Sequence, residues 1–84
     1  MTHHTHKERA ESIRQLYNLI VECCSQTSDG QTQIISIELD RLFALAAYRL
    51  GFTEGCAMKY LSVLEKLNMI RFDEENKIVS LNGD

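Results

Sequence analysis

The segment from Glu54 to about Asn68 restricts the possible folds more than any other part of the chain, because its apolar residues recur at intervals of three and four. On a helix, the residues that would share the apolar side are Ala57, Tyr60, Leu61, Leu64 and Leu67. Those on the opposite side are Gly55, Lys59, Ser62 and Lys66. Such a division is typical of a helix that buries one face against a core. The sequence therefore predicts a helix over 54–68 with its lysine side in solvent.

Two short runs with the character of strands come directly after this helix. Met69–Phe72 and Lys77–Leu81 contain β-branched and aromatic residues, and the residues of Asp73–Asn76 between them suit a turn. We therefore expect a β-hairpin at the C-terminal end of the chain.

Another helix is predicted ahead of this one, and a tight turn separates the two. The residues on its apolar side are Leu39, Leu42, Phe43, Ala46, Ala47 and Leu50. Gly51 is expected to end it, and Thr53 to cap the following helix by accepting an amide hydrogen bond.

The start of this middle helix admits two interpretations. Ile35, Ile37 and Leu39 alternate with polar residues, which favours a short half-buried strand. Ser36 or Asp40 could instead cap a helix that continues through the apolar stripe. We expect a short strand followed by the helix, with a border that the pattern does not fix.

A first helix is predicted over residues 7–25. Its apolar residues at helical spacing are Ile13, Leu16, Tyr17, Ile20 and Cys24. The polar run Ser25–Gly30 ends it, since glycine adopts backbone conformations that other residues resist. Leu19 and Val21 flank the stripe on opposite sides, so the helix carries more apolar surface than one core face needs. This surplus suggests a homodimer formed through the first helix.

Length and composition bound the class of protein. The chain has 84 residues, of which 44% are hydrophobic and 25% charged, which indicates one globular domain. Its net charge is -3, which excludes a strongly basic nucleic-acid binder. No apolar run approaches the roughly 20 residues of a membrane span. Residues 1–9 are polar and are not followed by the apolar core and cleavage site of a targeting signal. We expect a flexible leader over 1–7, a single domain over 8–82 and a cytoplasmic location.

The sequence lacks the features of an enzyme or a metalloprotein. Its cysteines, Cys23, Cys24 and Cys56, are odd in number and lack C-x-x-C spacing, so we expect reduced thiols in the core. All three histidines lie in the leader, where no metal site is assigned. Neither a glycine-rich phosphate loop nor a G-x-S-x-G turn is present. We therefore expect no catalytic residue, metal or cofactor.

The order of helix, short strand, helix, tight turn, helix and hairpin resembles the winged helix-turn-helix family over about residues 8–82. The stretch from Gly51 to Ile70 carries the resemblance, and it looks like the family's turn, recognition helix, leucine pair and helix-to-wing corner. The resemblance implies an α+β fold, a three-helix bundle with a short strand and a C-terminal β-hairpin wing. Asn68 stands where the family often has glycine, but asparagine tolerates the same left-handed conformation.

The resemblance also implies a function, because members that read DNA place the third helix in the major groove and the wing on the flanking backbone. The residues that would then face double-stranded DNA are Thr53, Gly55, Lys59, Ser62, Lys66, Arg71 and Lys77. Lysine and arginine can hold phosphates, and serine and threonine can bond to phosphates or bases. The resemblance thus predicts a small DNA-binding protein that serves as a transcriptional regulator or replication accessory.

The charge of residues 53–84 keeps an alternative open. Its cations are Lys59, Lys66, Arg71 and Lys77, and its anions are Glu54, Glu65, Asp73, Glu74, Glu75 and Asp84, a net charge of -2. The hairpin tip Asp73–Glu75 would repel phosphates if the wing lay on the duplex. Arg41 or Arg49 could extend the cationic face. The alternative is a winged-helix interaction module that binds protein partners in a larger assembly.

Overall fold

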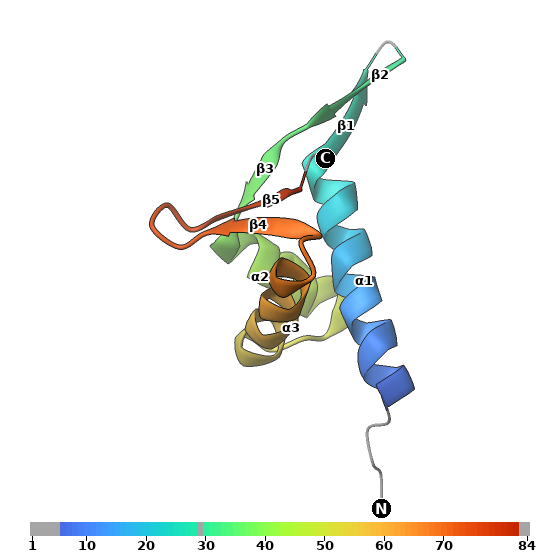
Figure 1. Ribbon diagram of the computed structural model, residues 1–84, viewed down its shortest axis with the longest axis vertical. Helices are drawn as coiled ribbons and strands as arrows, with labels where there is room; N and C mark the ends of the chain where they lie inside the picture. The colour runs from blue at the N-terminus through green and yellow to red at the C-terminus, as the bar shows by residue number, and fades with distance from the viewer. Residues whose placement is uncertain (1–5, 29, 83–84) are drawn as a thin grey trace, which may run out of the picture.

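The computed structural model describes residues 6–28 and 30–82 of the chain (Figure 1). Its helices are α1 (His6–Cys24), α2 (Leu39–Leu50) and α3 (Glu54–Lys66). Its strands are β1 (Ser25–Ser28), β2 (Gln31–Ile34), β3 (Ser36–Glu38), β4 (Ile70–Asp73) and β5 (Ile78–Leu81). The helices and the C-terminal hairpin therefore form where the sequence predicts them, with small shifts at their ends.

Three of the strands form one antiparallel sheet in the order β3–β5–β4. β4 and β5 are the predicted hairpin, in which Phe72 lies opposite Val79. β3 pairs with the other edge of β5 and places Ile37 opposite the same Val79. The short strand before α2 is thus joined to the C-terminal hairpin, and this pairing brings together segments that are far apart in the sequence.

The core lies between the three helices and this sheet. Leu61 and Leu64 of α3 are each only 1% exposed, so the leucine side of the predicted recognition helix is buried. The other buried residues of the core are Leu16, Leu19, Ile20, Cys24, Ile37, Leu39, Leu42, Ala46, Ala57, Ile70 and Val79. Burying apolar surface stabilises the fold by about 25 cal/mol per Å². Rotation of α3 would expose its leucines to water, so the shared core fixes the orientation of this helix.

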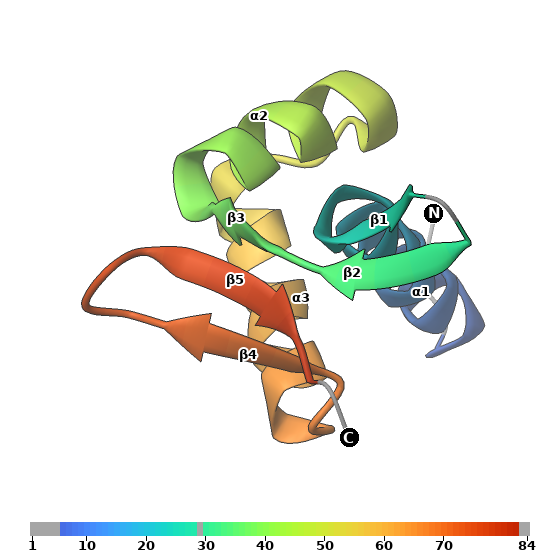
Figure 2. The same cartoon turned by 90° about the horizontal axis from the view of Figure 1, so that it is seen from above.

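This arrangement is the α+β layout of a winged helix, which confirms the predicted fold class. Figure 2 shows α3 with α1 on one side of it and the β4–β5 hairpin on the other. The hairpin is the wing, and we use that name for residues 70–81. α3 and the wing therefore border the same region of the surface.

An additional hairpin, β1–β2, was not predicted. The polar run after α1 was expected only to end the helix, but Ser25 pairs with Ile34 and Ser28 with Gln31. Gly30 has a positive φ of 78°, which glycine adopts without strain. The sequence signal was the Asp29-Gly30 pair, since Asp-Gly favours a tight hairpin turn. Figure 1 shows this hairpin extending beyond the end of α1.

The structure fixes the border between β3 and α2, which the sequence pattern left open. Leu39 fits both the strand alternation and the helical stripe, and it is the first residue of α2. Neither Ser36 nor Asp40 caps the helix; the N-cap position is Glu38, whose side chain makes no cap hydrogen bond. The amide of Leu39 donates to the carbonyl of Lys77 at 2.8 Å, so the wing satisfies one of the amides that the first turn of α2 leaves without a partner inside the helix.

Some apolar residues lie elsewhere than predicted. Ala47 was placed on the apolar side of the middle helix, but it is exposed. Leu67 was placed on the buried side of α3, but the helix ends at Lys66 and Leu67 is 60% exposed. The chain turns there because Asn68 adopts the expected left-handed conformation, with φ 61°. Leu19 was counted as surplus on α1, yet it is only 4% exposed and belongs to the core. Of the two surplus residues, only the partly exposed Val21 remains for a contact with a second copy.

The predictions about thiols, metal sites and membrane spans can be checked only within the residues that the structure describes. Cys24 is buried, Cys23 and Cys56 are partly buried, and all three are free thiols. Within residues 6–28 and 30–82, no three His, Cys, Asp or Glu side chains gather into a metal site. None of the helices in the same ranges has both the length and the hydropathy needed to cross a bilayer. Most of the predicted leader lies outside these ranges, and α1 already includes His6.

Candidate nucleic-acid interface

The turn that precedes α3 fixes where the candidate site begins. Gly51 ends α2 in the left-handed conformation, with φ 72°, as its sequence position predicted. The hydroxyl of Thr53 accepts a hydrogen bond from the amide of Cys56 at 3.2 Å, which confirms Thr53 as the cap of α3. Capping satisfies one of the amides that the first turn of a helix leaves without a partner. The first turn of α3 is therefore well defined in position.

The predicted solvent side of α3 is exposed along its whole length. Gly55, Lys59, Ser62 and Lys66 are all exposed, and Thr53 is exposed at the start of the helix. The side chains opposite them, Ala57, Leu61 and Leu64, are buried. The central geometric expectation from the sequence, a lysine side in solvent and a leucine side in the core, is thus found in the structure.

The wing carries the remaining two predicted cations. Arg71 lies on β4 between Ile70 and Phe72, which face the core, so strand alternation directs Arg71 away from it. Lys77 precedes β5 and has a positive φ of 55°, an uncommon conformation for lysine. Its carbonyl holds the start of α2 through the bond to Leu39. Both side chains are exposed.

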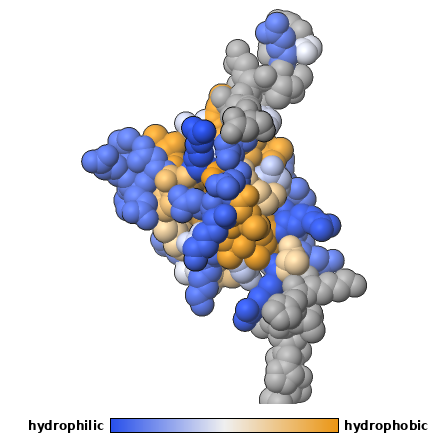
Figure 3. Space-filling model, viewed as in Figure 1, coloured by the Kyte–Doolittle hydropathy of each residue, from blue (hydrophilic) through white to orange (hydrophobic). Residues whose placement is uncertain are grey.

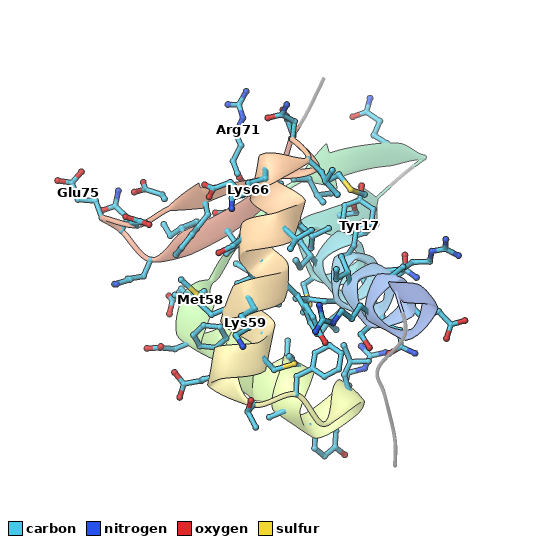
Figure 4. The ribbon with its side chains drawn as sticks, turned by 60° about the horizontal axis from the view of Figure 1, so that its bottom comes forward. Tyr17, Met58, Lys59, Lys66, Arg71 and Glu75 are labelled. Carbon is cyan, nitrogen blue, oxygen red and sulfur yellow. The ribbon has the colours of Figure 1, made fainter. Side chains whose placement is uncertain are left out.

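The structure brings three of the four cations into one group and leaves the fourth apart. Figure 4 shows Lys59, Lys66 and Arg71 following one another along α3 and onto β4. Lys77 instead lines a separate hollow of about 470 Å³ with residues that include Asp40, Glu54 and Met58. The candidate interface therefore consists of Thr53, Gly55, Lys59, Ser62, Lys66 and Arg71, which we call the α3 face. Lys77 lies beside carboxylates.

The tip of the wing is acidic and ordered by its own hydrogen bonds. The carboxylate of Asp73 accepts bonds from the amides of Glu75 and Asn76 at 3.0 and 3.2 Å and from the side chain of Asn76 at 2.8 Å. The bond from the Asn76 side chain is the main reason that the pKa of Asp73 is lowered, so its charge persists to lower pH. Figure 4 shows Glu75 at the far end of the wing, away from Lys59.

The arginines of α2 do not extend the α3 face. Arg49 forms an ion pair with Glu22 of α1 at 3.1 Å. Arg41 lines a hollow together with Cys23 and Ile37, between α1, β3 and α2. Both arginines thus lie on the side of α2 that faces α1, which corrects the expectation that either could add to the cationic surface.

Sequence reasoning missed the contribution of α1 to this region. Arg9 lines a hollow of about 860 Å³ with Thr53, Gly55 and Lys59 of the predicted site. The signal in the sequence was the position of Arg9 one turn ahead of Ile13, on the apolar side of the first helix. Arg9 lies within the predicted first helix, but it was given no role because only the apolar stripe of that helix was considered.

Comparisons of the chain with protein-family models, with curated proteins and with solved structures find no match. The resemblance to winged helices therefore depends on the sequence stretch and on the fold.

Proposed function

We propose that this protein binds double-stranded DNA through the α3 face, as a small transcriptional regulator or replication accessory of the cytoplasm. The observation that supports this proposal most is the continuous exposure of Lys59, Lys66 and Arg71 from α3 onto the wing, on a helix whose other side is held by the core. A rigid helix that presents cations to solvent suits the major groove, because its side chains reach bases while phosphates flank it.

Each residue of the α3 face has a role in this proposal. Lys59, Lys66 and Arg71 neutralise phosphates. Thr53 and Ser62 offer hydroxyls to phosphates or base edges, and Gly55 allows the helix backbone to approach the duplex closely. The acidic tip of the wing requires that the duplex lie along α3 and the β4 side of the wing, away from Asp73–Glu75.

The number of cations limits the strength of binding by a single chain. Strong salt-sensitive complexes make about six to ten phosphate contacts, and the α3 face offers the three cations Lys59, Lys66 and Arg71. A homodimer would double this number and place two copies of α3 on successive half-sites. We therefore expect weak binding by the monomer and tighter binding by any dimer.

An NMR titration of isotope-labelled protein with a short mixed-sequence duplex at about 50 mM salt tests the proposal, since low salt favours phosphate contacts. The amides of Lys59, Ser62, Lys66 and Arg71 should shift most, and those around Tyr48 on α2 should stay in place. Shifts confined to other surfaces would contradict the proposal. The absence of any complex would favour the alternative, a winged-helix module that binds protein, for which the acidic wing tip already argues.

A further inference from the structure

A groove runs between α1 and α3 on the side of α3 that faces away from the wing. Its hollow has a volume of about 860 Å³ and lies between the N-terminal halves of the two helices. Arg9 and Ser12 of α1 form one wall. Lys59, Tyr60 and Val63 of α3 form the other. This volume lies in the range of about 300–1,000 Å³ that is usual for binding sites.

The floor of the groove is aromatic and well packed. The rings of Phe52 and Tyr60 meet edge to face, with centroids 5.4 Å apart and an angle of 71° between their planes. Both rings pack against the core while part of each remains accessible. The two rings provide a rigid apolar surface on which a partner side chain can rest.

The groove is cationic, in contrast to the wing side of α3. Its charged residues are Arg9 and Lys59, and none of the described residues that line it carries a carboxylate. The hollow on the other side of α3 is lined by Asp40 and Glu54 as well as Lys77. The two sides of one helix thus prefer ligands of opposite charge, and the groove prefers an acidic one.

An exposed apolar strip continues the groove toward the C-terminal end of α3. Val63 is 37% exposed and Leu67 is 60% exposed, and they lie one helical turn apart. Figure 3 shows apolar surface gathered between α1 and α3, with hydrophilic surface on either side. Figure 4 shows Tyr17 on the side of α1 that faces α3. From Thr53 to Leu67 the groove and the strip together span about 20 Å at 1.5 Å per residue, which is the length of a helix of about 14 residues.

From these features we infer that the groove between α1 and α3 binds an acidic amphipathic helix of a partner protein. Apolar side chains of that helix, spaced by three and four residues, would rest on Tyr60, Val63 and Leu67, and its carboxylates would pair with Arg9 and Lys59. The shape favours this mode, because a helix lying in an apolar groove presents its anchors at this spacing. The inference stands independently of DNA binding, although both ligands would use Lys59.

A designed peptide tests this inference directly. The probe is a fluorescein-labelled peptide of about 15 residues, with leucines at positions i, i+4, i+7 and i+11 and glutamates at most other positions. Two control peptides keep most of its properties: one scrambles the same residues so that the leucine period is lost, and the other replaces every glutamate with lysine. Fluorescence anisotropy with the full chain should show the acidic amphipathic peptide binding at least about tenfold more tightly than either control.

Matched variants locate the binding surface. Arg9→Glu and Leu67→Ser should each weaken binding of the acidic peptide by about fivefold or more, because each removes one kind of contact. Arg41→Glu and Tyr48→Ser make the same kinds of change on α2, where Tyr48 is 89% exposed, and should leave binding unchanged. Circular dichroism of all four variants should show folded protein, since every substituted side chain is exposed.

Several outcomes would overturn the inference. These are equal binding of the scrambled peptide, no binding at about 1 mM peptide, or loss of binding in the α2 variants rather than the groove variants. A duplex that shifts the groove amides of Ser12 and Val63, while the peptide does not, would also reject it and assign the groove to nucleic acid.

Discussion

Burial controls the chemistry of individual side chains in this small domain, and Cys24 illustrates it. Cys24 is 0% exposed, and its thiol points to the carbonyl of Val79 at 3.8 Å. Removal from water raises its pKa to about 11, and the neighbouring Cys23 adds to the effect. Since the thiolate is the reactive form, Cys24 is protected both by its surroundings and by its protonation.

Single-cysteine variants would measure this protection. The variant that keeps only Cys24, with Cys23→Ser and Cys56→Ser, should react with a thiol reagent at about pH 8 far more slowly in the folded state than in denaturant, because the thiolate is rare and covered. The variant that keeps only the partly exposed Cys56 is the control. Equal rates for Cys24 in the folded and unfolded states would show that α1 does not bury it as described.

Leu61 and Leu67 allow the same substitution to be compared in two environments. Leu61 is 1% exposed and Leu67 60% exposed. We expect Leu61→Ala to lower the free energy of unfolding by about 2–5 kcal/mol, since it leaves a cavity in the core. Leu67→Ala should change it by less than about 0.5 kcal/mol. Urea unfolding of both variants checks this, and similar losses would mean that Leu67 is buried in solution, for instance by a second copy.

At the level of elements, the spacing of apolar residues was sufficient to predict the helices and the wing from the sequence. Leucines three residues apart on α3 define its buried side, and Asp73–Asn76 marks the turn of the wing because its residues favour local hydrogen bonds. Helix ends were also predictable where one residue decides them, as at Gly51 and Thr53. These features depend on neighbours in sequence, which is why the sequence alone could predict them.

Features that depend on distant partners could not be predicted from the sequence. The start of α2 has no capping side chain, and its first amide bonds to the carbonyl of the distant Lys77. The position of Leu67 depends on where Asn68 turns the chain toward β4. Arg9 lines the same hollow as Lys59 only because α1 packs along α3. In each case the decisive contact joins segments that periodicity treats separately.

Replacement of Gly51 or Gly55 by alanine tests the turn before α3 and the helix itself, respectively. A Cβ added at Gly51 or at Gly55 would meet nothing within 4 Å, so any effect comes from the backbone. Gly51→Ala should destabilise the fold by about 1–2 kcal/mol, because φ 72° is unfavourable for alanine. Gly55→Ala should stabilise it by up to about 1 kcal/mol through helix propensity. Thermal unfolding of both variants reports the signs, and a stabilising Gly51→Ala would contradict the turn geometry.

Over the whole molecule, charge is distributed unevenly around α3. The α3 face and the groove toward α1 are cationic, whereas the tip of the wing and the hollow beside Lys77 contain carboxylates. With a net charge of -3, the chain as a whole repels nucleic acid weakly, so any binding must come from this local separation. The binding proposed here should accordingly be more sensitive to the position of a cation than to the net charge.

The salt dependence of duplex binding tests the central claim most directly. We compare the double variant Lys59→Ala/Lys66→Ala with Arg14→Ala/Arg41→Ala, whose substituted side chains are exposed on other surfaces. Each of these double variants loses two positive charges. If Lys59 and Lys66 each hold one phosphate, the slope of log K against log salt should fall in magnitude by about 1.8 in the first variant and remain unchanged in the second. Equal slopes in a folded Lys59→Ala/Lys66→Ala protein and in the wild type would contradict the account.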